Sequence, residues 1–261
     1  MPTPLHVARL LDALEARAPT ALAEPWDNVG LLVGRRARSV SGVLVALDLR
    51  DAVLDEALAR GCDAVLTHHP PIFPHLNAVD DQRAPLVLRA AEEGIALIAA
   101  HTNLDSAAGG LNDVMGDLLG MGERAPLRPV ADDPAVGLGR VGAVEARSLG
   151  ELLARATAAF VGPIVHTGEL ERSVGRVACC TGSGGSLIDD AVAVGADPYV
   201  TGDLKCHDAD RSPTCALISI PHASVERVTL ERWSAGLAAD LAERGVPLHF
   251  STVDTDPWRA A

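Results

Sequence analysis

The chain has few aromatic residues, few basic residues and no long apolar run. Aromatic residues make up 3% of the 261 residues, and the formal net charge is −13. An acidic chain lacks the basic face that phosphate backbones require, so we expect no binding to nucleic acid and no attraction to anionic membranes. No apolar stretch approaches the roughly 18 residues of a membrane-spanning helix. The N-terminal residues also lack the basic and apolar stretches of a signal peptide.

Cysteine is scarce as well, and its spacing excludes two common roles. The five cysteines are odd in number and contain no C-x-x-C pair, so neither a disulfide framework nor a thiolate metal site is indicated. Adjacent Cys179 and Cys180, if they lie in a strand, point to opposite faces of the sheet. We therefore expect a reduced protein of the cytoplasm.

What the chain does contain is a set of metal-type side chains in three short motifs. The motifs span residues 66–73 (LTHHPPIF), 101–105 (HTNLD) and 222–226 (HASVE), and each follows an apolar run typical of a buried strand. The candidate metal ligands are His68, His69, Asp105, His222 and Glu226. Three imidazoles and two carboxylates can hold two divalent ions, roughly 3.5–4 Å apart, when the carboxylates bridge them. Nitrogen and oxygen ligands without thiolate suit zinc, manganese, iron or cobalt, so the metal is not distinguished.

Strand and helix patterns alternate along the chain in two series. The first series has strands at 31–33, 43–47, 64–66 and 95–100 and helices at 51–60, 85–93 and 111–119. After a linker rich in Pro, Gly and Asp at 120–139, the second has strands at 141–144, 174–179, 199–200, 216–220 and 246–252, and helices at 149–160, 187–194 and 224–243. This alternation predicts an α/β fold with mostly parallel sheets.

Two series of this kind predict two α/β domains. We expect the first at 1–122, completed by about 225–261, and the second at 123–224. In open α/β sheets, ligands bind outside the carboxyl ends of the strands. All three motifs follow predicted strands, so we expect the metal site at these strand ends.

Each candidate ligand also has a structural interpretation. Paired histidines occur on solvated loops, and Asp105 could cap the helix that begins near 109–111. His222 and Glu226 are four residues apart, so they could be an ordinary pair on one helix face. Their common placement after buried strands favours metal ligation for the whole set.

Other polar residues are candidates for catalysis or substrate binding. His101 lies in the same turn as Asp105 and is expected to orient a ligand or move a proton, which makes it the catalytic candidate. Direct metal ligation and a purely structural role are the alternatives for His101. Asn28, Asp203 and His207 are candidate substrate-binding residues, although Asn28 could instead fasten the N-terminal loop and Asp203 could orient a ligand. The glycine-rich segment 181–186 (TGSGGS) could hold an anion or form a tight turn.

Taken in order, the motifs resemble the NIF-three-like dinuclear metal-centre family, also called GTP cyclohydrolase I type 2 homologues. The matching segments are 26–34, 67–70, 101–105, 181–184, 202–207, and His222 with Glu226. The resemblance implies two interlinked α/β domains, toroidal homohexamers, and ligation of two ions at the positions of His68, His69, Asp105, His222 and Glu226. Pro221 and Cys206 depart from the family pattern, which often has glycine and an aromatic residue at these positions.

Two kinds of function fit these observations. The first is a metal-dependent hydrolase, cyclohydrolase-like, with a nucleotide such as GTP as candidate substrate. The second is a metal-trafficking or regulatory scaffold that binds ions without turnover, and a regulator that binds a mononucleotide is a third. An enzyme requires a substrate site beside the metals, lined by residues such as Asn28, Asp203 or His207. The sequence leaves the choice open.

Overall fold

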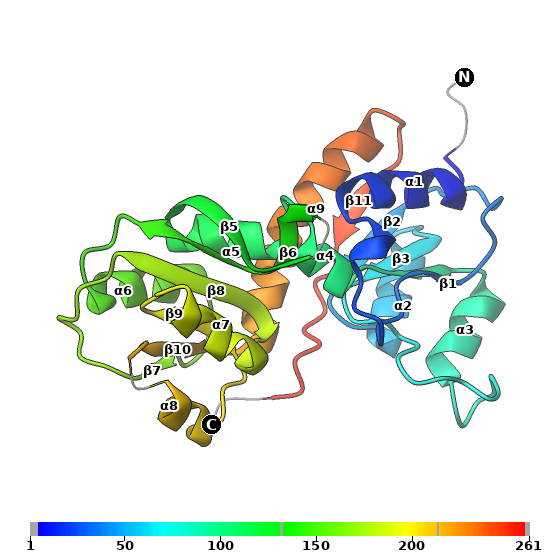
Figure 1. Ribbon diagram of the computed structural model, residues 1–261. Helices are drawn as coiled ribbons and strands as arrows, with labels where there is room; N and C mark the ends of the chain where they lie inside the picture. Colours follow the sequence, from blue (N-terminus) through cyan, green and yellow to red (C-terminus); the bar gives the residue numbers. More distant parts are fainter. Residues whose placement is uncertain (1–4, 131–132, 213, 259–261) are drawn as a thin grey trace. The chain divides into compact units, whose positions relative to one another are not determined.

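The computed structural model describes residues 5–130, 133–212 and 214–258. These residues form two compact units, one of residues 5–104 and 230–258 and the other of residues 105–229. The boundary falls inside helix α9 (His222–Ala242), so the second unit holds its first turns and the first unit holds the rest. Each unit contains its own sheet (Figure 1). The division assigns residues 105–122, expected in the first domain, to the second unit.

The first unit has a five-stranded, largely parallel sheet. Its strand order is β1 (Gly30–Val33), β4 (Ala96–Ala99), β3 (Ala64–Thr67), β2 (Val43–Ala46) and β11 (Leu248–Phe250). All neighbours pair in parallel except β1, which is antiparallel to β4 at the edge. Every residue of β2, β3 and β4 is buried, as expected for parallel strands covered on both faces.

Helices cover the first sheet. Helices α2 (Asp51–Ala59) and α3 (Pro85–Glu93) share an apolar core with β2, β3 and β4, built around residues such as Leu54, Val65 and Leu97. Helix α1 (Val7–Arg17) is joined to α9 by an ion pair between Arg17 and Asp240 at 2.7 Å. The short element η1 (Thr20–Leu22) belongs to this unit, and α4 (Thr102–Ser106) crosses the boundary between the units after Leu104.

The second unit has a six-stranded mixed sheet. Its strand order is β5 (Met121–Val130), β6 (Asp133–Val144), β8 (Arg176–Ser183), β9 (Tyr199–Gly202), β10 (Leu217–Ile220) and β7 (Val165–His166). Strands β8, β9 and β10 are parallel, and the outer pairs are antiparallel. The parallel expectation therefore holds for the strands that carry the motifs.

The predicted linker at 120–139 was wrong, because residues 121–130 and 133–139 lie in the paired strands β5 and β6. Proline and glycine content indicated a loop. Strand β5 lies at the edge of the sheet, however, where proline is tolerated because the outward N–H groups need no partner. Gly137 and Gly139 adopt positive φ angles of 149° and 63°, which bends β6 without breaking its pairing.

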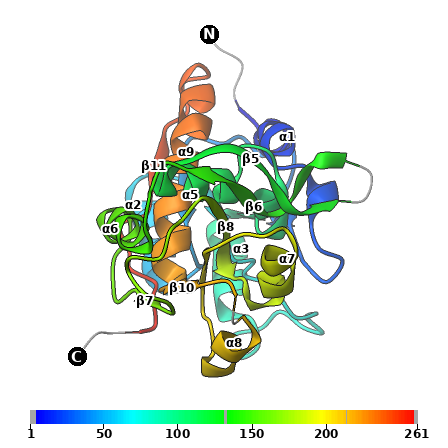
Figure 2. The same cartoon turned by 60° about the vertical axis from the view of Figure 1, so that its left-hand side comes forward.

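Both faces of the second sheet are covered by helices (Figure 2). Helices α5 (Leu111–Leu119) and α6 (Leu149–Ala159) share one core with Cys179, while η2 (Gly185–Leu187) and α7 (Ile188–Ala193) share another with Cys180. Helix α8 (Cys206–Arg211) is short and exposed. The prediction that the adjacent cysteines point to opposite faces is confirmed.

None of the helices described here combines the length and the apolar character needed to span a membrane.

Candidate metal centre

The first unit brings three histidines to one edge of its sheet. His68 and His69 follow β3, and His101 follows β4 after a single residue. The register pairs Thr67 with Ala99, so the carboxyl ends of the two strands are level. The imidazoles therefore converge for the reason that the sequence indicated, because parallel strands end at the same edge.

These three imidazoles form a compact cluster. One potential ligand atom from each lies within 4.8 Å of the other two. The ring centroids are 5.1 Å apart for His68 and His101, 5.3 Å for His68 and His69, and 5.6 Å for His69 and His101. His68 is fully buried, whereas the side chain of His69 is 30% exposed, so one side of the cluster faces solvent.

Each ring of the cluster is oriented by a hydrogen bond at Nδ1. The acceptor is the carbonyl of Ala100 for His68 at 2.9 Å, and the carboxylate of Asp48 for His69 at 2.8 Å. His101 donates to Asp27 Oδ1 at 2.9 Å. An imidazole that donates from Nδ1 has its lone pair on Nε2, the tautomer that a metal ion requires.

The two orienting carboxylates remain charged. Burial by itself raises the pKa of Asp27, but hydrogen bonds from His101 and Thr102 outweigh burial and hold the pKa far below its ordinary value. Burial likewise raises the pKa of Asp48, and hydrogen bonds from His69 and Thr255 lower it below the usual range. A charged carboxylate behind an imidazole increases the basicity of the ring as a ligand.

The second unit builds a related arrangement at the ends of β9 and β10. Helix α9 begins at His222, one residue after Pro221, so His222 and Glu226 are one turn apart. His222 Nε2 lies 2.9 Å from Glu226 Oε2, and His222 Nδ1 lies 2.7 Å from Asp203 Oδ2. Asp203 immediately follows β9 and adopts a positive φ of 53°, a conformation that aspartate tolerates better than most residues.

Two carboxylates make this histidine strongly basic. Burial alone lowers the pKa of His222, but the hydrogen bonds and negative charges of Glu226 and Asp203 outweigh burial and raise the pKa to about 9. A metal ion that binds an imidazole must displace its proton. The Glu226 side chain is buried, with 3% exposed. Its negative charge can be compensated either by a protonated His222 or by a bound cation.

Asp105 is a buried carboxylate of the second unit. It lies in α4 and accepts a hydrogen bond from Thr181 Oγ1 at 2.8 Å. The side chain of Asn112 donates to the Asp105 carbonyl and accepts from the Thr181 amide, which joins the two segments. The capping alternative was wrong, because the N-cap of α5 is Gly110.

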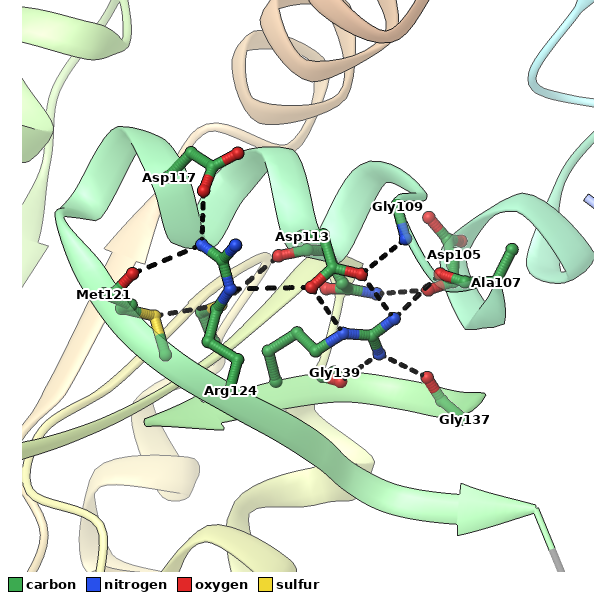
Figure 3. A network of polar contacts seen from close by, with 12 residues as sticks. Asp105, Ala107, Gly109, Asp113, Asp117, Met121, Arg124, Gly137 and Gly139 are labelled. Atoms are coloured by element: carbon green, nitrogen blue, oxygen red, sulfur yellow. Dashed lines mark hydrogen bonds and ion pairs between the residues drawn. The ribbon is translucent and has the colours of Figure 1, made fainter. Parts of the chain in front are cut away.

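The turn that follows Asp105 is anchored by a buried arginine. Arg140, 2% exposed, donates two hydrogen bonds to the carboxylate of Asp113 at 2.8–2.9 Å and one to the Ala107 carbonyl at 2.7 Å. Its Nη1 group donates to the carbonyls of Gly137 and Gly139 (Figure 3). The network fastens the β6 strand to α5 and to the turn beside Asp105.

Glycine is required next to the His222–Glu226 pair. Gly182 has a φ of +66°, and a β-carbon there would lie 2.6 Å from Glu226 Oε1. A β-carbon at Gly202 would lie 2.7 Å from the Gly182 carbonyl and 3.1 Å from the backbone of His222. The glycines allow the ends of β8, β9 and β10 to approach closely, which places Asp203 against His222.

The candidate substrate residues have different surroundings. The Asn28 side chain donates to the Ile72 carbonyl at 2.6 Å, and Asp203 orients His222. His207 lies on α8 with its side chain 95% exposed, 3.8 Å from the carboxylate of Asp210. The side chains of Asn28 and Asp203 therefore have hydrogen-bond partners within the protein, whereas the side chain of His207 lies on an open surface.

The glycine-rich segment 181–186 fits its interpretation as a tight turn. The Gly184 amide donates to Thr201 Oγ1, and Tyr199 donates to the Gly184 carbonyl, both at 2.9 Å. The helix that follows, α7, has six residues. Side chains of β9 thus satisfy the backbone of this turn.

Sequence reasoning assigned no individual role to Asp27, Asp48 or Thr181. A signal existed for Asp48, because it follows β2 as His69 follows β3, and the register pairs Ala46 with Thr67. Asp27 and Thr181 lie inside the segments 26–34 and 181–186, in which other residues were the candidates. Their hydrogen-bond partners lie more than 70 positions away, which no local pattern reveals.

The donor set fits a divalent metal ion that prefers nitrogen and oxygen ligands. The first unit offers imidazole nitrogens in the required tautomer, and the second offers one imidazole and two buried carboxylates. Burial makes Cys179 and Cys180 poor metal ligands, since it raises the pKa of the Cys179 thiol to about 12 and raises that of Cys180 well above its ordinary value. These thiols stay protonated and lie in apolar cores.

Comparison with known proteins agrees with the fold and the motifs. The family description Duf34/NIF3 (NGG1p interacting factor 3) matches residues 5–257. The chain is 35% identical over 254 residues to a "GTP cyclohydrolase 1 type 2 homolog" of Lactococcus lactis, covering 94% of this chain and 95% of that protein. It is 30% identical over 261 residues to "NIF3-like protein 1" of Drosophila melanogaster, covering 96% and 88%.

Solved structures show the same fold. A Bacillus cereus protein related to NIF3 has a TM-score of 0.88 at 22% identity, with 99% of this chain and 100% of that chain covered. A Staphylococcus aureus hypothetical protein has a TM-score of 0.88 at 26% identity with the same coverage. From the match over nearly its whole length, the chain belongs to the Duf34/NIF3 (NGG1p interacting factor 3) family.

Proposed function

We propose that the protein is a metal-dependent hydrolase with a dinuclear site held by His68, His69, Asp105, His222 and Glu226. The observation that carries this proposal is the histidine cluster of the first unit, whose three potential ligand atoms lie within 4.8 Å of one another. Each ring is oriented through Nδ1 by a carboxylate or a carbonyl. Histidines that bind metal ions almost always have such a partner.

The residues have distinct roles in this proposal. Two divalent ions held together supply Lewis-acid chemistry that polarises a substrate oxygen and lowers the pKa of a water molecule. The imidazoles fix the positions of the cations, and the carboxylates of Asp105 and Glu226 balance their charge. His101, oriented by Asp27, takes up and returns a proton at Nε2. Zinc, manganese, iron and cobalt all suit this donor set.

Resemblance to the family supports the proposed substrate and assembly. The curated relatives are named homologues of GTP cyclohydrolase 1 type 2, which supports a nucleotide such as GTP as the candidate substrate. We also propose a toroidal homohexamer in the cytoplasm, with no nucleic-acid or membrane partner, as the family resemblance and the acidic charge imply. Mass measurement of the native assembly tests the hexamer.

Metal analysis followed by activity assays tests the function. Native protein is analysed for bound metals, stripped with a chelator, reloaded with each candidate metal and assayed against a nucleotide panel. We expect turnover that disappears on chelation and returns with metal. Protein that binds two ions per chain, hydrolyses none of the nucleotides and passes metal to an acceptor protein would instead be a metal carrier. His101→Ala should lower turnover while most of the metal stays bound.

A further inference from the structure

Two of the few aromatic side chains lie exposed beside the histidine cluster. The chain has three tryptophans, three phenylalanines and one tyrosine. Trp26 is 58% exposed and Phe73 is 51% exposed, and their ring centroids are 5.8 Å apart at an interplanar angle of 64°. Both rings also contact His101, with centroid distances of 6.1 Å for Trp26 and 6.3 Å for Phe73. The aromatic pair therefore borders the cluster at His101.

The loops that carry these rings are fastened in place. Asp27, next to Trp26, accepts hydrogen bonds from His101 and Thr102 at the end of β4. Asn28 donates to the carbonyl of Ile72, the residue before Phe73. One short segment thus orients a histidine of the cluster with Asp27 and connects the two aromatic loops with Asn28. These hydrogen bonds fix the positions of the two loops that carry the rings.

Exposure of two large rings costs stability that burial would provide. Burying a side chain of this size is worth about 1.5–3 kcal/mol, and the two rings beside the cluster forgo this stabilisation. The exposed residues of the loop after Phe73 include the polar His75, Asn77 and Asp81, together with Pro74 and Val79, which is 50% exposed. A stable protein interface buries about 800 Å² per partner, far more than two rings supply. The pair suits a small ligand.

The geometry of the pair suits one kind of ligand. In an edge-to-face pair one ring presents its edge to the other, so a ring face stays open to a further planar group. Stacking on an aromatic side chain discriminates little among bases, because every base has a π-face. The histidine cluster next to the rings offers a place for a polar or anionic group of the same ligand once cations are bound.

We propose that Trp26 and Phe73 form an aromatic platform that stacks a planar conjugated heterocycle, while the polar end of the same ligand reaches the histidine cluster. This inference rests on the proposed metal function and adds the chemical class of the substrate, a ring-bearing molecule with a metal-binding group. Asn28, predicted as a substrate residue, acts here as a positioning residue that keeps the two loops together.

Tryptophan fluorescence provides a direct test. The other two tryptophans are Trp233, which is buried, and Trp258, which is 83% exposed, and phenylalanine can replace both. In the Trp233→Phe, Trp258→Phe protein, Trp26 is the sole reporter. Metal-loaded protein is titrated with guanosine monophosphate, cytidine monophosphate and ribose 5-phosphate, which has the phosphate without the ring. We expect saturable quenching by the two nucleotides and none by ribose 5-phosphate.

Calorimetry on variants with the native tryptophans adds the energetic test. Trp26→Ala and Phe73→Ala should each weaken nucleotide binding by about fivefold to 100-fold, the range of one lost stacking contact. Both variants should bind ribose 5-phosphate and metal like the wild type, and Trp26→Phe should retain most of the nucleotide affinity. Leu58→Ala, at a surface residue 46% exposed on α2, is the matched control and should change nothing.

The outcomes separate this inference from the metal function. If metal binds and the nucleotides bind no better than ribose 5-phosphate, the platform is wrong while the metal centre stands. If the nucleotides quench Trp26 in protein that holds no metal under any condition, the platform stands and the metal function fails. A Trp26→Ala protein that changes its oligomeric state and keeps its nucleotide affinity shows that the rings pack against another copy of the chain, which overturns the platform.

Discussion

The two units place histidines at strand ends in the same way but surround them differently. In the first unit, three imidazoles cluster, and the carboxylates of Asp27 and Asp48 stand behind the rings. In the second unit, one imidazole, His222, contacts two carboxylates, and a third, Asp105, is buried against Thr181. The first region is rich in imidazole nitrogens, and the second is rich in carboxylates.

This difference indicates that the two regions have different roles in binding metal ions. Neutral imidazoles fix a metal ion with directional bonds, whereas carboxylates compensate its charge and can bridge two ions. A buried carboxylate is costly unless a positive charge or several donors accompany it. The second region should therefore depend more on bound cations, and the first should depend more on ring orientation.

The largest expected effect comes from removing a carboxylate of the second region. Asp105→Ala should lower metal affinity by more than about 100-fold, because loss of a ligand exceeds the 10–100-fold typical of an orienting partner. Elemental analysis and competitive chelation measure the affinity. Asp105→Asn is the control, since its amide oxygen can still accept the hydrogen bond from Thr181 but carries no charge. Equal metal content in the wild type and Asp105→Ala would refute the assignment.

The next effect concerns the buried arginine next to Asp105. Arg140→Met leaves the Asp113 carboxylate without its main partner and should cost roughly 3–5 kcal/mol in the free energy of unfolding. Arg124→Met removes an arginine whose pairs with Asp113 and Asp117 lie nearer the surface, and should cost about 1 kcal/mol or less. Chemical denaturation measures both values. Similar losses in the two variants would contradict the special role of Arg140.

The same pair predicts a dependence on pH. Burial raises the pKa of Asp113, but the hydrogen bonds and charge of Arg140 outweigh burial and lower the pKa below its ordinary value. A lowered pKa stabilises the folded state fully above the unfolded pKa of about 3.9, and this stability is lost as pH falls further through the folded pKa. The difference in unfolding free energy between the wild type and Arg140→Met should therefore shrink below about pH 4. A constant difference across this range would exclude the charge of Asp113 as its source.

The orienting carboxylates of the first region should have a moderate effect. Asp48→Asn and Asp27→Asn each change the acceptor behind an imidazole and should weaken metal binding about 10–100-fold. Asp12→Asn, which alters an exposed ion pair with Arg9 on α1, is the matched control and should bind metal normally. If both variants bound metal like this control, ring orientation would not limit affinity in the first region.

The smallest effect separates backbone strain from contact with Glu226. Gly182→Ala and Gly195→Ala both introduce a β-carbon at a positive φ, +66° and +69°, which costs roughly 1–2 kcal/mol in stability. Only the β-carbon at position 182 would meet Glu226, since nothing lies within 4 Å at position 195. We expect similar losses of thermal stability but a loss of metal affinity in Gly182→Ala alone. A loss in both would attribute the effect to strain.

Much of the fold followed from local patterns in the sequence. The apolar runs at β2, β3 and β4 are short and bounded by helices with glycine after them, so strands and order were predictable. The β5–β6 hairpin was not, because pairing between distant segments outweighed a composition of proline and glycine typical of loops. Strand β7, with two residues, carries too little pattern to be recognised.

The sequence by itself determined which side chains end the strands, and hence that His68, His69 and His101 meet, because parallel strands in register end at one edge. Only the tertiary structure decided which acceptor forms the hydrogen bond with Nδ1 of each histidine. The Asp27–His101 bond joins residues 74 positions apart, and the Asp203–His222 bond joins residues 19 apart. Such partners are selected by three-dimensional packing and hydrogen-bond satisfaction, which leave no periodic signal along the chain.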